Sequence, residues 1–430
     1  MLNSAQLNTA SGERECAESV ADATDPPNLI WLIPAKEAGP RDSIAVPVSW
    51  GGVPVNQQKR VTVKLLRLVL VLILVGGCSL DNRPSTPPVA SSSPSAPTAS
   101  PSTIPPSPSA PDSASPSLPT GPQATVRLAL DWTPNTDHTG FYVARAKGWY
   151  AQAGIDLKIL PYASATPETL LAAHQAECGI SFQDSMTFAV AAGADIVSVA
   201  AILQRTASAI GVLADSPIQR PRDLDGKTYA GFGYPNEDPT LKFVIKADGG
   251  TGVFKTATLD SAAYEALYNH RADFTIPFTA WEGVEADQRG IKLRYFQFAD
   301  YGFPDFYQVV LGCDRQWLEK DPDAAKRFVA ATAAGFAFSA QHPDEAAALL
   351  VSENPGVFDA NKDLPRASQE FLVKGGFLLD AQGTFGTQTL DRWRGYSDFL
   401  YQQGLLADAA GKPLTKPLDY ARLFTNDFLP

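Results

Sequence analysis

A segment rich in proline and serine divides the chain and restricts where a folded domain can lie. Of the 41 residues from Asn82 to Pro122, 25 are Pro or Ser. Such a composition cannot bury enough apolar surface to offset the conformational entropy lost on folding. We therefore expect residues 79–124 to form a disordered tether, which reaches on the order of 100 Å if it is mostly polyproline-like. The folded part then begins at residue 125.

A short apolar run precedes this tether. Residues 65–77 are almost wholly apolar and follow a cluster of basic side chains in residues 59–64. A basic segment followed by an apolar run of this length is typical of a signal peptide and is short for a bilayer span. The run ends in Val-Gly-Gly-Cys, which resembles a bacterial lipobox with Cys78 as the lipidated residue. We expect residues 59–78 to be a lipoprotein signal and Cys78 to anchor the protein outside the cytoplasm.

The position of this signal makes the first residues hard to interpret. A signal peptide begins near the true N-terminus, yet residues 1–58 precede this one. We interpret residues 1–58 as a mis-called N-terminal extension and place the start of translation close to Val61 or Val63. Detection of a peptide from residues 1–58 in the native organism would contradict this interpretation.

The charge balance and the cysteines exclude two classes of site. The formal net charge is −11, and residues 78–430 carry 28 Lys and Arg against 39 Asp and Glu. Phosphate contacts need clustered Lys and Arg, so nucleic acid is not expected as a partner. Cys16, Cys78, Cys178 and Cys313 form no metal-binding motif, which argues against a structural zinc site. Cys178 and Cys313 could pair outside the cytoplasm, but we expect two separate buried thiols.

Apolar patterns from residue 125 onward predict alternating strands and helices. This alternation indicates an α/β fold with a mostly parallel sheet covered on both faces. The predicted strands are 126–130, 157–160, 179–182, 196–202, 209–213, 228–231, 272–276 and 308–311. The predicted helices are 141–147, 167–175, 185–192, one from about 239, one from 281, 316–353, 368–371 and 390–401.

Two α/β lobes fit this pattern better than one. The block 215–305 has its own strand–helix units and is flanked by crossings near 209–215 and 305–312. We expect the first lobe to comprise residues 125–214 and 306–430, where the latter range includes the C-terminal helices. A chain that leaves one lobe, builds a second and returns places a ligand cleft between the two.

The stretch 130–156 carries the most informative candidate side chains. It spans a predicted strand end and helix start, where small ligands bind in an open α/β sheet. Trp132 and Tyr142 can stack on a flat ligand, while Asn135 and His138 can hydrogen-bond to its edge. Core packing of the two aromatic residues, and capping or packing by Asn135 and His138, are the structural alternatives. We favour ligand contact for Trp132 and leave Asn135 and Tyr142 open.

Two later strand ends carry further candidates. Gln183 and Asp184 follow a predicted strand at its junction with a helix, although Asp184 could equally be the helix N-cap. Gly233 lies in a strand-to-helix turn, where turn geometry alone could require glycine. No third glycine follows at the dinucleotide-binding spacing. Glu237 lies at the start of the next helix, and we expect it to pair with an amine of the ligand.

Several motifs together resemble one family of binding proteins. Residues 130–144 read Leu-Asp-Trp-Thr-Pro-Asn-Thr-Asp-His-Thr-Gly-Phe-Tyr-Val-Ala and resemble the opening of the ThiY-like solute-binding proteins. These proteins serve ABC importers of thiamine pyrimidine precursors. Further matches lie at residues 147–148, 154–156, 199–204, 223–227, 231–237 and 281–286. The likeness covers essentially all of 125–430, and Trp-x-Pro-Asn-x-x-His is its most specific part.

The resemblance implies a fold, a ligand and partners. The fold is the type II periplasmic-binding-protein fold, with two α/β lobes and a hinged interlobe cleft. The ligand is a formylated aminopyrimidine or a close relative, and the partners are an ABC permease and an ATPase. The resemblance also favours a ligand contact for His138.

An aminopyrimidine ligand directs attention to Glu282. A carboxylate accepts hydrogen bonds from an exocyclic amine and from a protonated ring nitrogen at once. Trp281 beside it belongs to the same candidate set, although packing within the second lobe is its more natural role. Thr279 stands where the family often has a Tyr.

The same superfamily contains the fungal thiamine-pyrimidine synthase, an enzyme. Its lysine and histidine in the segment similar to residues 178–185 correspond here to Ser181 and Ser185. Its cysteine-rich motif is also missing, since residues 305–308 read Asp-Phe-Tyr-Gln. We therefore expect a binding protein without a cofactor and without enzymatic activity.

The sequence as a whole predicts a monomeric, lipid-anchored protein that captures a formylaminopyrimidine-like precursor and delivers it to an ABC importer. One alternative is a binder of a sulfonate, taurine or nitrate on the same fold. Such anions need Arg, Lys and helix N-termini in the cleft, whereas the candidates here are Trp, Asn, His and Glu. The other alternative is an enzyme of pyrimidine synthesis.

Overall fold

The computed structural model describes residues 116–430. The predicted N-terminal extension, the predicted lipoprotein signal with Cys78 and most of the predicted tether therefore lie outside the described residues. Residues 116–123 lead into the first strand, and Leu118 packs against the core. Within the described part of the chain, no helix combines the length and the apolar character needed to cross a membrane.

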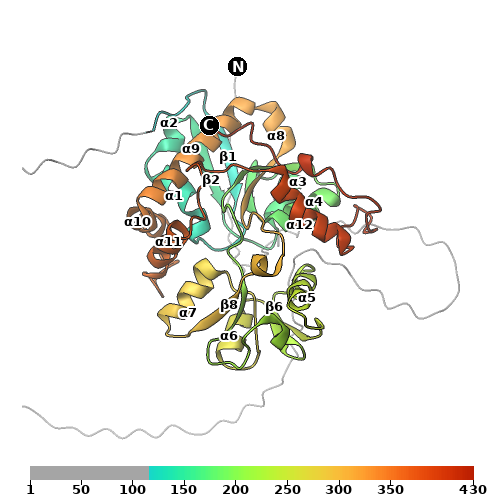
Figure 1. Cartoon of the computed structure of the whole chain (residues 1–430). Helices are drawn as coiled ribbons and strands as arrows, with labels where there is room; N and C mark the ends of the chain where they lie inside the picture. The colour runs from blue at the N-terminus through green and yellow to red at the C-terminus, as the bar shows by residue number, and fades with distance from the viewer. Residues whose placement is uncertain (1–115) are drawn as a thin grey trace, which may run out of the picture. The chain divides into compact units, whose positions relative to one another are not determined.

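Five strands form the sheet of what we call the large lobe, in the order β2-β1-β3-β9-β4 (Figure 1). Their bounds are β1 Ala124–Ala129, β2 Ile155–Leu160, β3 Cys178–Ser181, β4 Ile196–Ala201 and β9 Val310–Asp314. Strand β1 pairs in parallel with β2 and β3, but β9 pairs antiparallel with both β3 and β4. Four of the five strands therefore run in the same direction, and the predicted mostly parallel sheet is confirmed for this lobe with one exception. The exception is β9, which enters from the second lobe and runs the opposite way.

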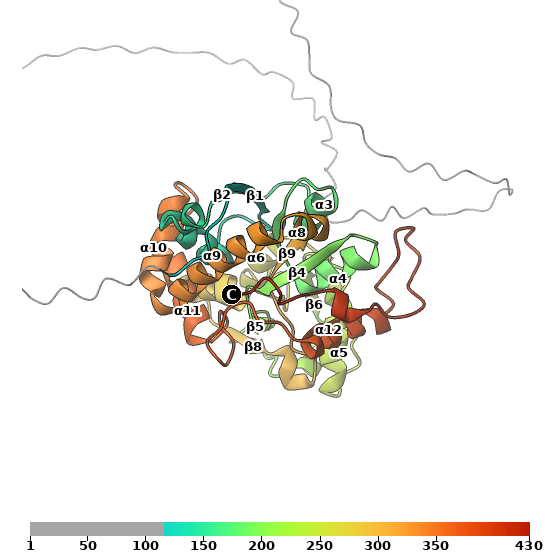
Figure 2. The same ribbon diagram turned by 90° about the horizontal axis from the view of Figure 1, so that it is seen from above.

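Helices cover both faces of this sheet, and β3, β4 and β9 are buried along their whole length. The helices are α1 Thr139–Ala146, α2 Trp149–Gln152, α3 Pro167–Ala172, α4 Gln183–Ala191, α8 Arg315–Lys320, α9 Pro322–Gln341, α10 Pro343–Glu353, α11 Leu364–Lys374 and α12 Leu390–Gln402. Figures 1 and 2 both show α10 and α11 at one end of the lobe and α4 and α12 at the other. The predicted helical region 316–353 is three helices, because Pro322 and Pro343 each open a new one.

Two glycines set the distance between α1 and α9. A Cβ atom added to Gly335 on α9 would lie 2.0 Å from the carbonyl oxygen of Gly140 on α1. One added to Gly140 would lie 2.2 Å from the ring of Phe336. This close approach fixes α1, which directly follows the segment that carries Trp132, Asn135 and His138.

The small lobe contains the remaining strands and helices. Strand β5 pairs antiparallel with β8, β6 pairs in parallel with β7, and single bridges at Phe274 and Thr275 join these pairs. The predicted strand 272–276 is thus reduced to these bridges. The bounds are β5 Ile210–Leu213, β6 Thr228–Gly231, β7 Lys255–Thr258, β8 Leu293–Phe296, α5 Glu237–Ala247, α6 Ala262–Tyr268 and α7 Val284–Gln288. Because β5 lies in this sheet, the first crossing precedes Ile210.

A disulfide joins Cys178 and Cys313. The expectation of two separate thiols is therefore wrong. The residues are 135 apart in sequence, but they lie directly opposite each other on β3 and β9, with a Cα–Cα distance of 4.0 Å. Only the antiparallel pairing of β9, which the sequence analysis did not foresee, brings them together.

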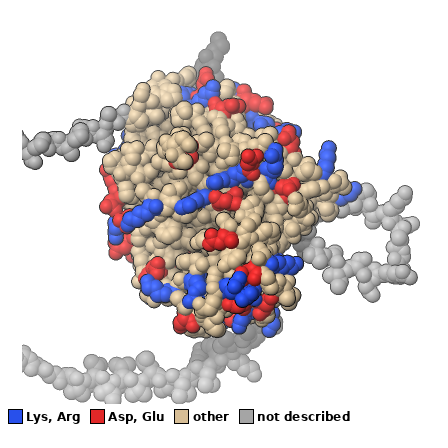
Figure 3. All heavy atoms as spheres, viewed as in Figure 1, with Lys and Arg blue, Asp and Glu red and all other residues tan. Residues whose placement is uncertain are grey.

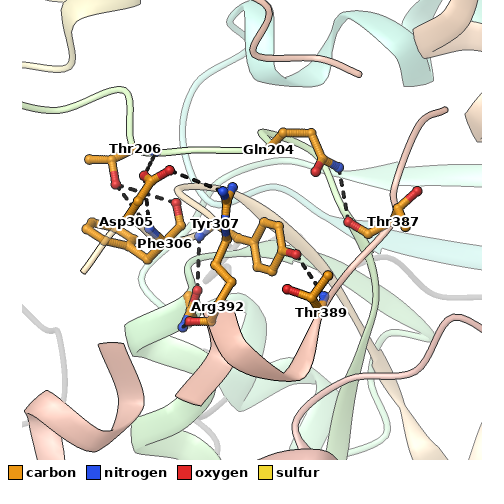
Figure 4. A network of polar contacts seen from close by, with 9 residues as sticks. Gln204, Thr206, Asp305, Phe306, Tyr307, Thr387, Thr389 and Arg392 are labelled. Atoms are coloured by element: carbon orange, nitrogen blue, oxygen red, sulfur yellow. Dashed lines mark hydrogen bonds and ion pairs between the residues drawn. The ribbon is translucent and has the colours of Figure 1, made fainter. Parts of the chain in front are cut away.

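Polar contacts hold the two interlobe crossings against the start of α12 (Figure 4). The backbone N–H of Thr206, on the first crossing, donates to Oδ1 of Asp305 on the second at 3.0 Å. Arg392 of α12 forms an ion pair with the same carboxylate at 3.3 Å. The hydroxyl of Tyr307 accepts from the backbone N–H of Thr389 at 2.8 Å. These contacts tie the two interlobe crossings to the large lobe.

Candidate ligand-binding cleft

A cavity of about 450 Å³ lies between the two lobes. The large lobe contributes the segment after β1, the start of α4, and α12, while the small lobe contributes the start of α5, helix α6 and the turn that leads into α7. Sites for drug-sized ligands have volumes of roughly 300–1,000 Å³. Six of the ten candidate residues line the cavity: Trp132, Asn135, Asp184, Glu237, Trp281 and Glu282.

A short 3-10 turn at Thr136–His138 organises the wall that follows β1. Asn135 caps this turn, because its Oδ1 accepts from the backbone N–H of Asp137 at 2.8 Å. Nδ1 of His138 accepts from the backbone N–H of Asn135 at 3.3 Å, which leaves the ring proton on Nε2. That nitrogen lies 2.8 Å from Oδ1 of Asp131. His138 is fully buried behind the wall, so it positions the cavity-lining Asp131 and does not itself reach the cavity.

The predicted aromatic residues divide between wall and interior. Trp132 lines the cavity and packs at a tilt against the exposed ring of Tyr162, with the ring centroids 4.9 Å apart. Tyr142 is buried in a separate cluster with Phe358 and does not line the cavity. Trp281 does both, since it lines the cavity and lies 6.4 Å from the ring of Phe358.

Gln183 and Asp184 follow β3 but face different ways. Gln183 is fully buried, accepts from the backbone N–H of Tyr307 at 2.9 Å and donates to two carbonyls at the start of α12. Gln183 therefore holds the hinge and lies away from the cavity. Asp184 lines the cavity, and its Oδ2 accepts from Nδ2 of Asn236 in the small lobe at 2.7 Å. This hydrogen bond joins the two lobes.

Glu237 lies at the first position of α5 and organises the turn before it. Its two carboxylate oxygens accept from the backbone N–H groups of Phe232 at 3.1 Å and Gly233 at 3.0 Å. Gly233 has a φ of +91°, which is the geometry that favours glycine, and it lies beside the cavity without lining it. Burial raises the pKa of Glu237, although these N–H groups oppose the increase.

Glu282 lies on a π-helical turn, Thr279–Gly283, which presents its carboxylate to the cavity. Oε2 accepts from the backbone N–H of Phe278 at 3.2 Å. Burial, with a contribution from the charge of Glu285, raises the pKa of Glu282 from 4.5 to about 7. This carboxylate therefore gains or loses a proton near neutral pH.

Asp137, in the large lobe, is a second buried acid that lines the cavity. Its side chain is only 6 % exposed, and burial together with the charges of Asp131 and Glu282 raises its pKa. Among the described residues, no donor reaches its Oδ1, and Thr240 Oγ1 on the opposite lobe is likewise buried and without a partner. Both atoms can accept a hydrogen bond from a ligand.

The cavity wall carries an excess of acidic side chains. Seven carboxylates line it: Asp131, Asp137, Asp184, Glu237, Glu265, Glu282 and Glu285. Arg289 is the one basic residue among the described lining residues, and it pairs with Glu265 at 2.6 Å. On the outer face shown in Figure 3, by contrast, acidic and basic side chains are interspersed. The cavity is thus built to receive hydrogen-bond donors and positive charge.

Several lining residues were not predicted from the sequence. Asp131 and Asp137 lie inside the stretch 130–156 but were not among the candidates. Tyr264 and Tyr268 come from α6, which was not predicted at all, because no strand-end signal precedes it. Tyr234 lies within the matched motif 231–237 but was not a candidate. A count of acids within the matched motifs would have found the two aspartates.

Comparison with solved structures identifies the fold. The chain resembles the crystal structure of the alkanesulfonate-binding protein SsuA from Xanthomonas axonopodis pv. citri bound to MOPS, with a TM-score of 0.52 and 16 % identity. The similarity covers 67 % of this chain and 96 % of that one. The type II periplasmic-binding fold, with two α/β lobes around a cleft, is thereby confirmed.

Sequence comparison then finds relatives. The NMT1/THI5-like family model matches residues 135–346, so this part of the chain is similar to that family. The formylaminopyrimidine-binding protein of Halalkalibacterium halodurans is 28 % identical over 275 residues, which is 63 % of this chain and 82 % of the relative. The riboflavin-binding protein RibY of Chloroflexus aurantiacus is 25 % identical over 372 residues, which is 84 % of this chain and 96 % of the relative. A 4-amino-5-hydroxymethyl-2-methylpyrimidine phosphate synthase of Legionella pneumophila is 25 % identical over 237 residues, which is 54 % of this chain and 75 % of the relative.

Proposed function

We propose that this protein is an extracytoplasmic solute-binding lipoprotein that captures a formylaminopyrimidine-like precursor and delivers it to an ABC importer. The partners are the permease and ATPase of that importer, and Cys78 carries the lipid anchor. The observation that carries the proposal is the cavity wall, where seven carboxylates face aromatic rings and the one arginine is already paired.

The helix starts at the cavity also favour a ligand rich in donors over an anion. Sulfonate-type ligands need free backbone N–H groups at helix N-termini, or basic side chains. Here Oδ1 of Asp184 accepts from the N–H of Ser185 at the start of α4. Glu237 takes the two N–H groups of the turn that precedes α5. The chain's own carboxylates therefore occupy the positions that an anionic ligand would need.

Glu282 supplies the recognition expected for an aminopyrimidine. One carboxylate can accept both from the exocyclic amine and from the adjacent ring nitrogen once that nitrogen is protonated. An ionised Glu282 can accept both hydrogen bonds from a ligand whose ring nitrogen carries a proton. A protonated Glu282 must first give up its own proton before it can do so. Trp132 supplies a flat surface against which the ring stacks.

A carrier function is supported further by the segment that resembles the catalytic part of the synthases. Ser181 is buried, and its hydroxyl donates to Glu168, so it is part of the packing behind α3. Ser185 lines the cavity with a hydroxyl where those enzymes have a basic side chain. We expect hinge closure on the ligand instead of turnover, with the lobes stabilised in the closed form that the permease recognises.

Calorimetric titration of the purified protein tests this function. We expect saturable binding of formylaminopyrimidine and no heat with alkanesulfonates, taurine or nitrate. Small-angle scattering should show a more compact protein after the pyrimidine is added. Binding of a sulfonate without binding of any pyrimidine would overturn the proposal. Formation of a pyrimidine product after incubation with pyridoxal phosphate and iron would show that it is an enzyme.

A further inference from the structure

We propose that the cleft takes an elongated, unphosphorylated heteroaromatic cation that presents a hydrogen-bond donor or a positive charge at each end. This inference rests on the proposed function and extends it. Buried acceptors without a donor among the described residues come from both lobes, Oδ1 of Asp137 from the large lobe and Oγ1 of Thr240 from the small lobe.

The first end lies between the segment after β1 and the turn that leads into α7. Asp131, Asp137 and Glu282 meet there, from both lobes. Asp137 is 6 % exposed and its Oδ1 has no partner among the described residues. A buried acceptor without a donor is costly, so this atom points to a donor supplied by the ligand.

The second end lies between the starts of α4 and α5, beside α12. Asp184 lines the cavity there and already accepts from Asn236, whereas Oγ1 of Thr240 is buried at 5 % exposure with no partner in the described chain. Oδ1 of Asn236 is also without a donor. Figure 1 shows α7 and α5 on opposite sides of the small lobe; Glu282 lies on the turn that leads into α7, and Thr240 lies on α5.

Aromatic rings line the cavity between the two ends. Trp132 comes from the large lobe, and Phe232 comes from the small lobe, where its ring is stacked with Tyr234 at 6.1 Å and tilted against Tyr264 at 5.8 Å. Such faces attract a cation as well as a flat ring. At about 450 Å³ the cavity has room for a ligand larger than a single small ring.

A phosphate on the ligand would meet only repulsion. Arg289 is engaged by Glu265, and the helix starts of α4 and α5 carry Asp184 and Glu237. A phosphorylated form of the same ligand would therefore place two negative charges among seven carboxylates. The cleft distinguishes the free compound from its phosphate ester by charge alone.

Four probes test this by titration calorimetry on the purified protein. They are hydroxymethyl aminopyrimidine, thiamine, thiamine monophosphate and riboflavin. Thiamine joins the same pyrimidine to a positively charged thiazolium ring, and riboflavin is a larger neutral ring system. We expect thiamine to bind at least about tenfold more tightly than the single ring, and the phosphate to cancel that gain.

The outcomes separate this inference from the proposed function. Equal or tighter binding of the single ring, of riboflavin or of thiamine monophosphate would overturn the two-ended cation while leaving a pyrimidine carrier intact. If no pyrimidine compound binds at all, both proposals fail.

Isosteric variants assign the two ends. Asp184→Asn should weaken thiamine binding by about tenfold and leave the single ring within about twofold, whereas Asp137→Asn should weaken both ligands. Thr240→Val offers a second probe of the Asp184 end. Asp391→Asn, with a side chain 95 % exposed on α12, is the control and should change neither. Equal losses for both ligands in Asp184→Asn, in a protein that melts like wild type, would refute the second end.

Discussion

Replacing Glu282 by Gln should stabilise the empty protein and weaken its binding of ligand. Burial raises the pKa of this carboxyl from 4.5 to about 7. The folded protein therefore binds a proton that the unfolded chain lacks between these two values, and stability falls as the pH rises through that window. A difference of this size corresponds to at most roughly 3 kcal/mol, fully lost above neutral pH.

Gln keeps the shape of the side chain but cannot ionise. Glu282→Gln should therefore match wild type at about pH 4 and exceed its free energy of unfolding by up to ~3 kcal/mol at about pH 8. Binding changes in the other direction, because a charged acceptor is lost. A hydrogen bond to a charged group contributes about 1.5–3 kcal/mol, which corresponds to a loss of affinity of roughly 10- to 150-fold.

Urea unfolding of the empty protein across this pH range gives the first quantity, and calorimetric titration with the pyrimidine gives the second. Glu319→Gln is the matched control, since Glu319 is exposed on α8 and should change neither. A Glu282→Gln protein that is no more stable than wild type at about pH 8 would refute the burial argument. Unchanged affinity would refute the role of Glu282 in recognition.

Three further predictions concern the scaffold. Gly335→Ala should destabilise the protein by more than about 2 kcal/mol in urea unfolding, because its Cβ would lie 2.0 Å from the Gly140 carbonyl oxygen. Gly395→Ala, whose Cβ would meet only Pro304 at 3.1 Å, should have a much smaller effect, and equal effects would contradict the packing account. The double variant Cys178→Ser with Cys313→Ser should lose roughly 2–5 kcal/mol of stability, and wild type should lose as much on reduction with dithiothreitol. An unchanged urea midpoint in both would show that the disulfide does not stabilise the native state. His138→Ala should lower ligand affinity by about tenfold although the ring does not reach the cavity, since Asp131 loses its partner at 2.8 Å. Calorimetry alongside a melting curve would separate this from general loss of fold, and full affinity in a folded variant would exclude a positioning role.

The sequence allowed prediction of features that depend on local pattern. The strands at 196–202 and 228–231 and the helix at 390–401 match elements of the structure, because each carries its own apolar period and its own ends. The family motifs also placed Trp132 and Glu282 at one cavity. These features need only neighbours in sequence or a matched motif.

Features that depend on contacts between residues far apart in the sequence could not be predicted. The direction of β9 and the disulfide it creates follow from the path of the chain through the small lobe, which no local pattern encodes. The side chain of Gln183 turns inward because Tyr307, more than a hundred residues later, presents a backbone N–H to it. Tyr142 is drawn into a cluster with Phe358 in the same way. A residue at a strand end may face either side, and only tertiary contacts decide which.

The place of β9 in the large sheet has a consequence for the order of folding. It is the last strand of that sheet in the chain, yet it lies between β3 and β4 in the interior. Until residues 310–314 arrive, both neighbours present unpaired edges, which are sites of mispairing between chains. The large lobe therefore cannot finish folding before the whole small lobe has been synthesised. Formation of the Cys178–Cys313 bond should report the moment at which the last strand is inserted.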